Sequence, residues 1–329
     1  MLLALCLATA GAAAAQTAFS PAAAAGSGGA PAPAAPPQGA PVDPNEVLVE
    51  ELVVEARDGG PAWWKVRDGD SVVYVLGVPS VAPKGLEWDR RVFERRLRGA
   101  SRVILPFNNV GVDALGAPRV LINLLRLRGR PAEERLEGPL RARFIAARES
   151  IGQPASRYGY KNEIAVGILL VTDYRDHARL TAADPGKTIA RLAKASGVKT
   201  VSRTYDLGPL MGAALRTSAA AQRACLLEAL DEVETRGEGV RKAGEAWARG
   251  DVTDALGAER SYERCINAAP GALKVDARIK TDQADAIAEA LKTPGHAIAV
   301  APLRPLLARD GVLDLLRRRG FQVSTPGED

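Results

Sequence analysis

Few side chains in this sequence are of the types that enzymes use for acid–base or nucleophilic chemistry. Its 329 residues include two histidines, His177 and His296, and neither stands in a recognisable catalytic motif. Ser80 is the most suggestive hydroxyl, because it follows an apolar run that ends at Gly77. A serine nucleophile needs a base within reach of its hydroxyl group. Lys84 is the nearest lysine, but its spacing predicts no contact, so the residues leave a serine hydrolase open without favouring it.

Two cysteines of the central region are candidates for a disulfide rather than for catalysis. Both histidines are far in sequence from Cys225 and Cys265, so no imidazole is placed to activate a thiol. An even pair of cysteines forms a disulfide in an oxidising compartment. We therefore expect a Cys225–Cys265 disulfide if the chain is exported, and two buried thiols as the alternative.

The composition excludes some classes of partner. The formal net charge is +5, from 44 Lys and Arg against 39 Asp and Glu, so attraction to anionic surfaces is weak. Aromatic residues make up only 5% of the chain, and no motif interleaves them with basic residues. This argues against a nucleic-acid partner. Scattered Asp and Glu side chains could bind Mg²⁺ or Ca²⁺, but no motif arranges them for it.

The amino-terminal residues have the pattern of an export signal. M-L-L-A-L-C-L-A-T-A-G-A-A-A-A-Q has a short apolar core, and Ala13–Ala15 fits the A-x-A cleavage pattern. No Lys or Arg precedes the apolar run, so a disordered alanine-rich tail is the alternative. Residues 16–45 are mostly Ala, Gly, Pro and Ser, which is typical of a flexible linker. We expect a signal peptide over residues 1–15, a periplasmic or secreted protein, and no membrane span after cleavage.

The elements that would position Ser80 begin with short β-rich runs. Predicted strands cover residues 46–57, 63–67, 71–76 and 102–105. The pair Asp68-Gly69 predicts a tight hairpin between the second and third of these strands. An amphipathic helix over residues 89–97 precedes the fourth strand, which suits a parallel crossover.

The centre of the chain is predicted to be helical, and its end returns to strands. Predicted helices cover residues 119–127, 140–149, 162–178, 186–195, the stretch after Pro209 to about Arg249 with a break near Gly237, and residues 252–268, 282–291 and 306–319. Further strands are predicted at residues 198–201, 296–300 and 321–324. Both ends are therefore β-rich. We predict an α/β fold whose central mixed sheet takes strands from both termini, with a large helical insertion, in one domain over residues 46–329.

Four phrases of the chain, in their order, carry a family likeness. They are P-A-W-W-K-V-R-D-G-D-S-V-V-Y-V-L-G, L-E-W-D-R-R-V-F-E-R-R-L-R-G-A-S-R-V-I-L, A-W-A-R-G-D and H-A-I-A-V-A-P-L-R-P-L-L-A-R-D-G-V-L-D-L-L-R-R-R-G-F-Q-V. They resemble, in turn, the first hairpin, the first helix and second core strand, a central phrase, and the closing strand–helix–strand of the TraB/GumN family. This family is related to the Tiki proteases and more distantly to the erythromycin-esterase and ChaN-like folds. The resemblance covers about residues 46–326.

The resemblance implies a metal site that this chain does not reproduce. In the family, one histidine follows the first core strand, a carboxylate ends the next strand, and a second histidine follows the closing strand. Such ligands could hold a divalent ion and activate water. The corresponding positions here are Ser80, Pro106 and Arg304. A neutral hydroxyl is a poor ligand, proline offers no side-chain ligand, and guanidinium repels a cation, so we expect no metal cofactor.

Two further phrases fit a divergent subgroup. Some members carry G-x-x-S-P-x-P-K-G-x-x-W after the first core strand, and V-P-S-V-A-P-K-G-L-E-W is similar to it. The family's E-R-N phrase corresponds to Glu259-Arg260-Ser261, with its asparagine replaced.

Three hypotheses follow from the residues and the resemblance together. The first is a pseudoenzyme that keeps the scaffold, has lost the metal-dependent hydrolase or protease site, and acts by binding. The second is a hydrolase with divergent chemistry at the same pocket, with Ser80 as nucleophile. The third is a binding module for a small-molecule or envelope ligand, in which Ser80 and Arg304 hold an anion. An ion pair between Arg304 and Asp310 is the structural alternative for that arginine.

Overall fold

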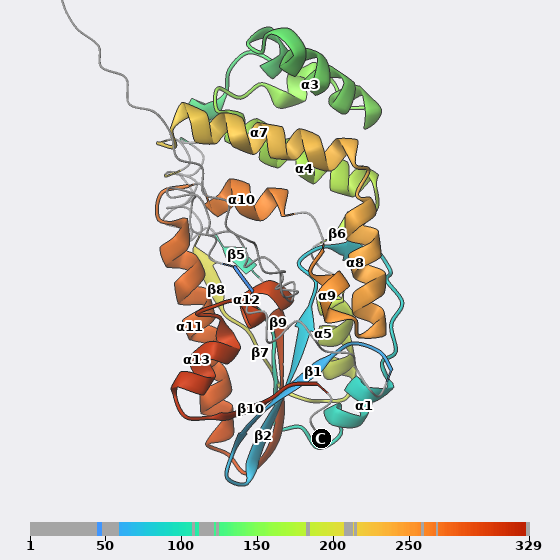
Figure 1. The fold of residues 1–329 in the computed structure, drawn as a ribbon, viewed down its shortest axis with the longest axis vertical. Coiled ribbons are helices and arrows are strands. Elements are labelled where there is room, and N and C mark those ends of the chain that lie inside the picture. Colours follow the sequence, from blue (N-terminus) through green and yellow to red (C-terminus); the bar gives the residue numbers. More distant parts are fainter. Residues whose placement is uncertain are drawn as a thin grey trace, which may run out of the picture. The chain divides into compact units, whose positions relative to one another are not determined.

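The structure is a computed structural model (Figure 1). It describes residues 45–47, 59–106, 109–111, 122, 125–181, 185–206, 213, 216–257, 260–267 and 269–326. The architecture is α/β, with a mixed six-stranded sheet and a helical region, which confirms the predicted fold class.

A β-hairpin opens the described part of the sheet. β1 (Trp63–Asp68) pairs antiparallel with β2 (Ser71–Val78), and Asp68 lies opposite Ser71 across a two-residue turn. Gly69 has a φ of +56°, a conformation that costs glycine little, and this explains the D-G signal at the turn. The predicted hairpin is confirmed, and β2 runs two residues further than expected.

The central strand of the sheet comes from the end of the chain. The strand order is β10-β1-β2-β9-β4-β7. β9 (Gly295–Pro302) lies between β2 and β4 (Val103–Ile104) and is parallel to both. β7 (Thr200–Val201) extends the parallel part, and β10 (Gln322–Ser324) pairs antiparallel with β1. The sheet therefore needs both ends of the folded chain, as predicted.

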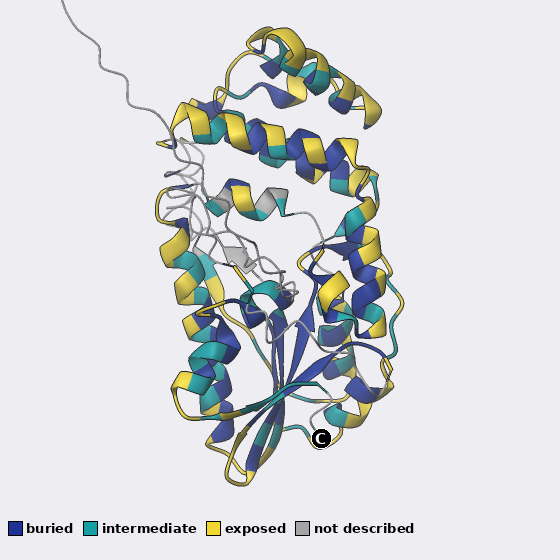
Figure 2. Ribbon diagram, in the orientation of Figure 1, coloured by how far each residue is buried: buried dark blue, intermediate teal, exposed yellow. Residues whose placement is uncertain are grey.

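Helices cover both sides of this sheet (Figure 1). α11 (Ala272–Leu291) and α13 (Val312–Arg318) lie on one side, and α1 (Arg91–Leu97), α5 (Gly186–Ala195) and α8 (Glu238–Arg249) lie on the other. The inner strands β2, β4 and β9 are mostly dark in Figure 2, because most of their side chains are buried between these layers, whereas the edge strands β7 and β10 are more exposed. Burial from both sides explains why β9 reads as an unbroken run of small and branched apolar residues.

The helical insertion has a hydrophobic core of its own. α3 (Gly138–Ser150), α4 (Glu163–His177) and α7 (Ala219–Glu234) enclose buried side chains such as Phe144, Leu170 and Leu230. The Asn162 side chain caps the start of α4 by accepting the Ile164 N–H. Between α4 and α7, Arg175 Nε donates to the fully buried carboxylate of Glu232 at 2.6 Å.

Shorter elements connect these parts. They are β3 (Ala82–Pro83), β5 (Asn109–Gly111), η2 (Ala132–Glu134), η3 (Ala155–Tyr158), β6 (Leu180–Thr181), β8 (Thr204–Asp206), α9 (Val252–Ala255), α10 (Ser261–Asn267) and α12 (Leu303–Leu307). None of the helices in the described part of the chain is both long and apolar enough to cross a membrane.

Three predicted helix boundaries were wrong. The helix expected over residues 252–268 is two helices, α9 and α10, and the one expected over 306–319 is α12 and α13. Asp310, with a φ of +57°, and Gly311 separate the second pair. The helix expected at 282–291 begins at Ala272, because its charged first half lies on the surface and lacks an apolar period. Most of the strand predicted at 46–57 and of the helix predicted at 119–127 lies outside the described residues.

Candidate functional site

The three degenerate family positions follow three neighbouring parallel strands. β2 ends at Val78, β4 at Ile104 and β9 at Pro302, and Val78 lies opposite Pro302 in the register. Ser80, Pro106 and Arg304 each come two residues after their strand. Because carboxyl ends of parallel strands meet at one edge of a sheet, the topology brings these positions to the same edge. This edge, with residues 77–80, 105–106 and 302–304, is called the strand-end site below.

Ser80 is exposed and contacts a residue that the sequence did not single out. Its hydroxyl donates to Glu263 Oε1 at 3.2 Å. Glu263 belongs to α10, and its other oxygen accepts Arg260 Nε at 3.4 Å. The hydroxyl at the histidine position is therefore the first member of a Ser80–Glu263–Arg260 chain. Arg260 belongs to the phrase that resembles the family's E-R-N, and this phrase was the only signal near Glu263.

Arg304 is half-buried and bonds to the backbone of a neighbouring helix. It is the second residue of α12, and its Nη2 donates to the carbonyl oxygen of Leu256, the residue that ends α9. A cation at this place suits the negative end of a helix. The expected pairing with Asp310 is not what the structure shows, because the Asp310 carboxylate accepts Arg318 Nη1 at 2.5 Å.

Three of the family phrases meet near the end of β2. Trp247, in α8, donates its indole N–H to the Gly77 carbonyl oxygen at 2.6 Å in a buried contact. Its ring also meets Trp88 edge to face, with 5.5 Å between ring centroids. Gly250 ends α8 with a φ of +85°, and the Asp251 side chain caps α9. The A-W-A-R-G-D phrase therefore has a structural role, holding α8 and α9 against the end of β2.

The packing around Gly77 leaves little space. A Cβ atom at this position would lie 2.5 Å from Leu303 Cδ1 and 3.1 Å from the Trp64 ring. The depression bordered by Gly77, Trp247 and Leu303 is too small to hold a water molecule. At this point the strand-end site is filled by side chains.

Lys84 contacts the helical region and is not the charged group that contacts Ser80. Its ammonium lies 3.0 Å from Asp176 Oδ1, and its backbone N–H donates to Arg179 O at 2.8 Å. The second contact continues the short antiparallel pairing of β3 with β6. Glu263, not Lys84, is the charged group that the structure places on the Ser80 hydroxyl.

The two histidines lie away from the strand-end site. His177 is the last residue of α4 and is exposed. His296 is the second residue of β9, at the opposite end of that strand from Arg304, and its Nε2 lies 2.7 Å from the Arg96 carbonyl oxygen. Neither position offers an imidazole to the three strand ends.

The central cysteines form the predicted pair. Cys225 and Cys265 are joined by a disulfide that links α7 to α10, with their Cα atoms 4.7 Å apart. Both residues are buried. Since Cys265 follows Glu263 by two residues, the same short helix carries the disulfide and the hydrogen bond to Ser80.

The donor set at the strand ends does not fit the metal that the resemblance implies. Ser80 offers a neutral hydroxyl that is donated to Glu263, Pro106 has no donor atom in its ring, and Arg304 carries a fixed positive charge. Glu263 is a single carboxylate with Arg260 beside it. Within the described ranges, no three His, Cys, Asp or Glu side chains gather closely enough to form a metal-binding group.

One of three comparisons with known proteins finds a match. No curated protein and no solved structure matches the chain. Residues 62–325, which run from β1 to β10, match the TraB/PrgY/gumN family. This match covers most of the 329 residues and includes all three strand ends. The chain therefore belongs to the TraB/PrgY/gumN family.

Proposed function

We propose that this protein is an extracytoplasmic member of the family that has lost the metal-dependent hydrolase or protease site and acts by binding. The observation that carries the proposal is the strand register. It gathers the three expected ligand positions at one edge, and Ser80, Pro106 and Arg304 occupy them. The scaffold that would orient a metal is kept, while the ligand chemistry is absent from it.

The contacts at the strand-end site support a binding or scaffolding role. Trp247 bonds to Gly77, Arg304 to Leu256, and Ser80 to Glu263. Each of these polar groups has an internal partner contributed by the helices α8 to α10. A hydrolytic centre needs a nucleophile or ion that faces the substrate and is activated by a base or a metal. These bonds instead fix helices against the sheet.

Metal content tests the proposal. The mature protein should contain no stoichiometric Zn²⁺, Mn²⁺ or Co²⁺ by elemental analysis after incubation with each ion and desalting. The matched variant is Ser80→His/Pro106→Glu/Arg304→His, which restores the family's ligand types at the same three strand ends. It should gain a bound ion, because two imidazoles and one carboxylate suit such metals. One tightly held ion per chain in the unchanged protein would overturn the proposal.

Export is tested separately. Residues 1–45 fused to a reporter that is active only outside the cytoplasm should give activity, and the mature chain should begin at Gln16 after cleavage at the A-x-A pattern. A reporter that stays inactive would contradict the extracytoplasmic location. The metal measurement does not depend on this result.

A hydrolase with divergent chemistry is the second candidate, because the Ser80 hydroxyl donates to a carboxylate. Glu263 lies 3.2 Å away, within the distance that a general base requires. Carboxylates are weaker bases than imidazole, and Arg260 competes for the same carboxylate group. Any esterase or peptidase activity of the protein should disappear in Ser80→Ala and in Glu263→Gln. Activity that survives both substitutions would reject this pair.

Anion binding by Ser80 and Arg304 is the third candidate. Both side chains follow strands that are direct neighbours, and a guanidinium suits an ionised acidic group. Under this hypothesis Arg304→Gln should weaken binding of an acidic envelope polymer, and salt should weaken it in the unchanged protein. Equal affinities for the two proteins would reject it.

A further inference from the structure

A cleft lies on the α11 side of the sheet and shares Leu105 with the strand-end site. It has a volume of about 330 Å³ and lies between α11 and the edge of the sheet formed by β4 and β7. Its floor is apolar and consists of Ile104, Leu105 and Val201. Clefts that bind small molecules typically begin at about 300 Å³ and are lined mainly by apolar side chains. The size and the floor both suit a small organic molecule.

The acidic residues on the α11 wall are neutralised by basic partners. Asp282 accepts the Tyr205 hydroxyl at 2.8 Å and Arg203 Nη1 at 3.0 Å. Burial, followed by the hydrogen bond to Asp282, raises the pKa of Tyr205 to about 12, so this hydroxyl keeps its proton at neutral pH. The wall therefore does not present an open set of carboxylates to a cation.

The other acids of this wall are paired at its rim. Asp285 lies 2.8 Å from Arg319 Nη2, and Glu289 lies 2.6 Å from Lys292 Nζ. The pKa of Glu289 is lowered, first by its hydrogen bond with Lys292 and to a smaller extent by the charge of Arg102. The charge of Arg102 therefore reaches the Glu289 end of the wall, beside the ion pair with Lys292.

Arg102 and Arg203 are the basic residues that line the cleft, and Arg203 is ion-paired with Asp282, whereas Arg102 acts on Glu289 through its charge alone. Arg102 precedes β4, lines the cleft beside Ile104, and is half-buried. Its guanidinium makes no hydrogen bond or ion pair with any residue that the structure describes. A half-buried guanidinium beside an apolar floor favours an ionised ligand group that it can bind in a bidentate way.

We propose that this cleft binds a small organic carboxylate, whose charged group is held by Arg102 and whose apolar body lies on Ile104, Leu105 and Val201. One guanidinium with an apolar floor suits a singly charged amphipathic acid better than inorganic phosphate, which needs several donors around it. Tyr205, Asp282 and Arg203 also line the cleft, and their polar groups are bonded to one another rather than left open for the ligand. The inference does not depend on whether the strand-end site binds a metal.

The test uses two probes that share one body and differ in charge. Binding of 4-phenylbutyrate and of 4-phenylbutanol to the full-length protein is measured by isothermal titration calorimetry. We expect one saturable site for the acid, and affinity weaker by about tenfold or more for the alcohol, because the charge-assisted contact is lost. In competition with a labelled analogue of the acid, the unlabelled acid should displace one equivalent of the label per protein chain.

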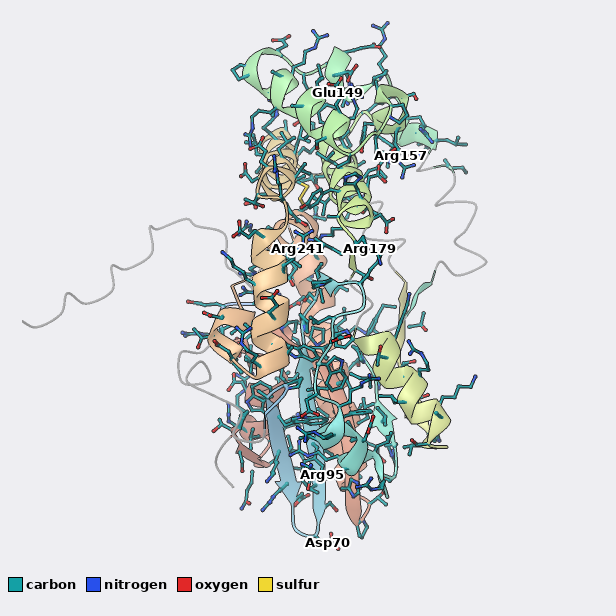
Figure 3. All side chains as sticks on the ribbon, turned by 90° about the vertical axis from the view of Figure 1, so that its right-hand side faces the viewer. Asp70, Arg95, Glu149, Arg157, Arg179 and Arg241 are labelled. Carbon is teal, nitrogen blue, oxygen red and sulfur yellow. A yellow bond between two sulfur atoms is a disulfide. The ribbon has the colours of Figure 1, made fainter. Side chains whose placement is uncertain are left out.

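Three variants locate the site. Arg102→Gln should weaken binding of the acid by about tenfold or more and leave the alcohol unchanged. Ala286→Phe, which fills the cleft from α11, should abolish binding of both probes. Arg95→Gln removes an exposed arginine of α1, on the other side of the sheet, and should change neither (Figure 3). Circular dichroism checks that each variant is folded.

Each possible result decides the proposal. It is overturned if 4-phenylbutyrate shows no saturable binding at millimolar concentration, or if Arg102→Gln binds the acid as tightly as the unchanged protein. Phosphate that competes as well as the acid would replace the carboxylate class with a general anion site and so overturn it too. If Ala286→Phe does not fold, Arg102→Gln together with the acid–alcohol pair still gives the answer.

Discussion

At the scale of single residues, Gly77 shows how a family landmark can be a packing requirement. Its position after the strand predicted over residues 71–76 first suggested a catalytic turn, but in the structure it lies within β2 and is surrounded by Leu303, Trp64 and Leu306. Its carbonyl oxygen accepts the buried indole N–H of Trp247. Glycine is needed because a side chain does not fit between these neighbours, whether or not the adjacent Ser80 does any chemistry.

Substitution of this glycine measures that requirement. Gly77→Ala should lower the free energy of unfolding by about 1–3 kcal/mol, because the new Cβ would lie 2.5 Å from Leu303 Cδ1 and force the neighbours apart. Urea unfolding followed by tryptophan fluorescence gives the value. Gly186→Ala is the matched control: nothing lies within 4 Å of its added Cβ at the start of α5, so it should be neutral or slightly stabilising. Equal effects at the two positions would contradict the packing argument.

Tyr205 is a second residue whose surroundings can be measured. Its pKa is raised from 10.0 to about 12, chiefly by burial and then by its hydrogen bond to Asp282. Because the folded state holds this proton more tightly, the stabilisation is complete below pH 10 and is lost as the pH rises through about 12. The measurement is the phenolate absorbance of the protein as a function of pH, from which the absorbance of the Tyr205→Phe variant is subtracted. The difference should show one tyrosine ionising near pH 12. In urea, where the protein is unfolded, the midpoint of this ionisation should fall to about pH 10. A midpoint near pH 10 in the folded protein would be evidence against the burial of Tyr205.

At the scale of elements, the seven-residue helix α10 connects two parts of the molecule. It carries Glu263, which bonds to Ser80, and Cys265, which joins α7. The disulfide therefore connects the helical insertion to the helix that lies against the strand-end site. Its loss should affect the position of α10 as well as the global stability.

Removal of this disulfide should lower the free energy of unfolding by about 2–5 kcal/mol, since the bond closes a loop between residues 40 apart in sequence. The measurement compares urea unfolding with and without dithiothreitol. The double variant Cys225→Ser/Cys265→Ser should resemble the reduced protein and should not respond to the reductant. If dithiothreitol changes the free energy of unfolding of both proteins equally, or of neither, the disulfide does not stabilise the fold as argued.

At the scale of the whole molecule, the sequence predicted the sheet better than the site. Hairpin and strands could be read from local pattern, because D-G at residues 68–69 and the apolar run of β9 are short-range signals. The family phrases then placed Ser80 and Arg304 at strand ends. The partner of Ser80 could not be predicted, because Glu263 reaches it only through the packing of α10, and a seven-residue helix has no pattern that encodes its neighbours.

The cleft on the α11 side was missed for a related reason. Arg102, Tyr205 and Asp282 come from three distant parts of the sequence, and none of them lies in a recognisable motif. The helix that forms the wall was itself predicted ten residues too short, so Asp282 stood at its expected start rather than in its middle. Sites formed by tertiary packing of this kind leave no local signal in a single sequence.

The position of β9 gives the last prediction. This strand lies between β2 and β4, and residues 297–301 are almost fully buried. Without it, the hairpin of β1 and β2 has no hydrogen-bonded connection to β4 and β7. A chain that ends at Pro294 should therefore show no cooperative thermal transition by circular dichroism, although it keeps nearly all of the helical insertion.

A chain that ends at Gly320 is the matched control, because it loses only β10, an edge strand that pairs with β1 alone. It should fold and melt cooperatively at a reduced temperature, since edge pairing contributes less than a buried central strand. If the chain ending at Pro294 also melts cooperatively, the hairpin and the helical insertion form independent folding units. The sheet would then assemble onto them, and the closing strand would complete the fold without being required for it.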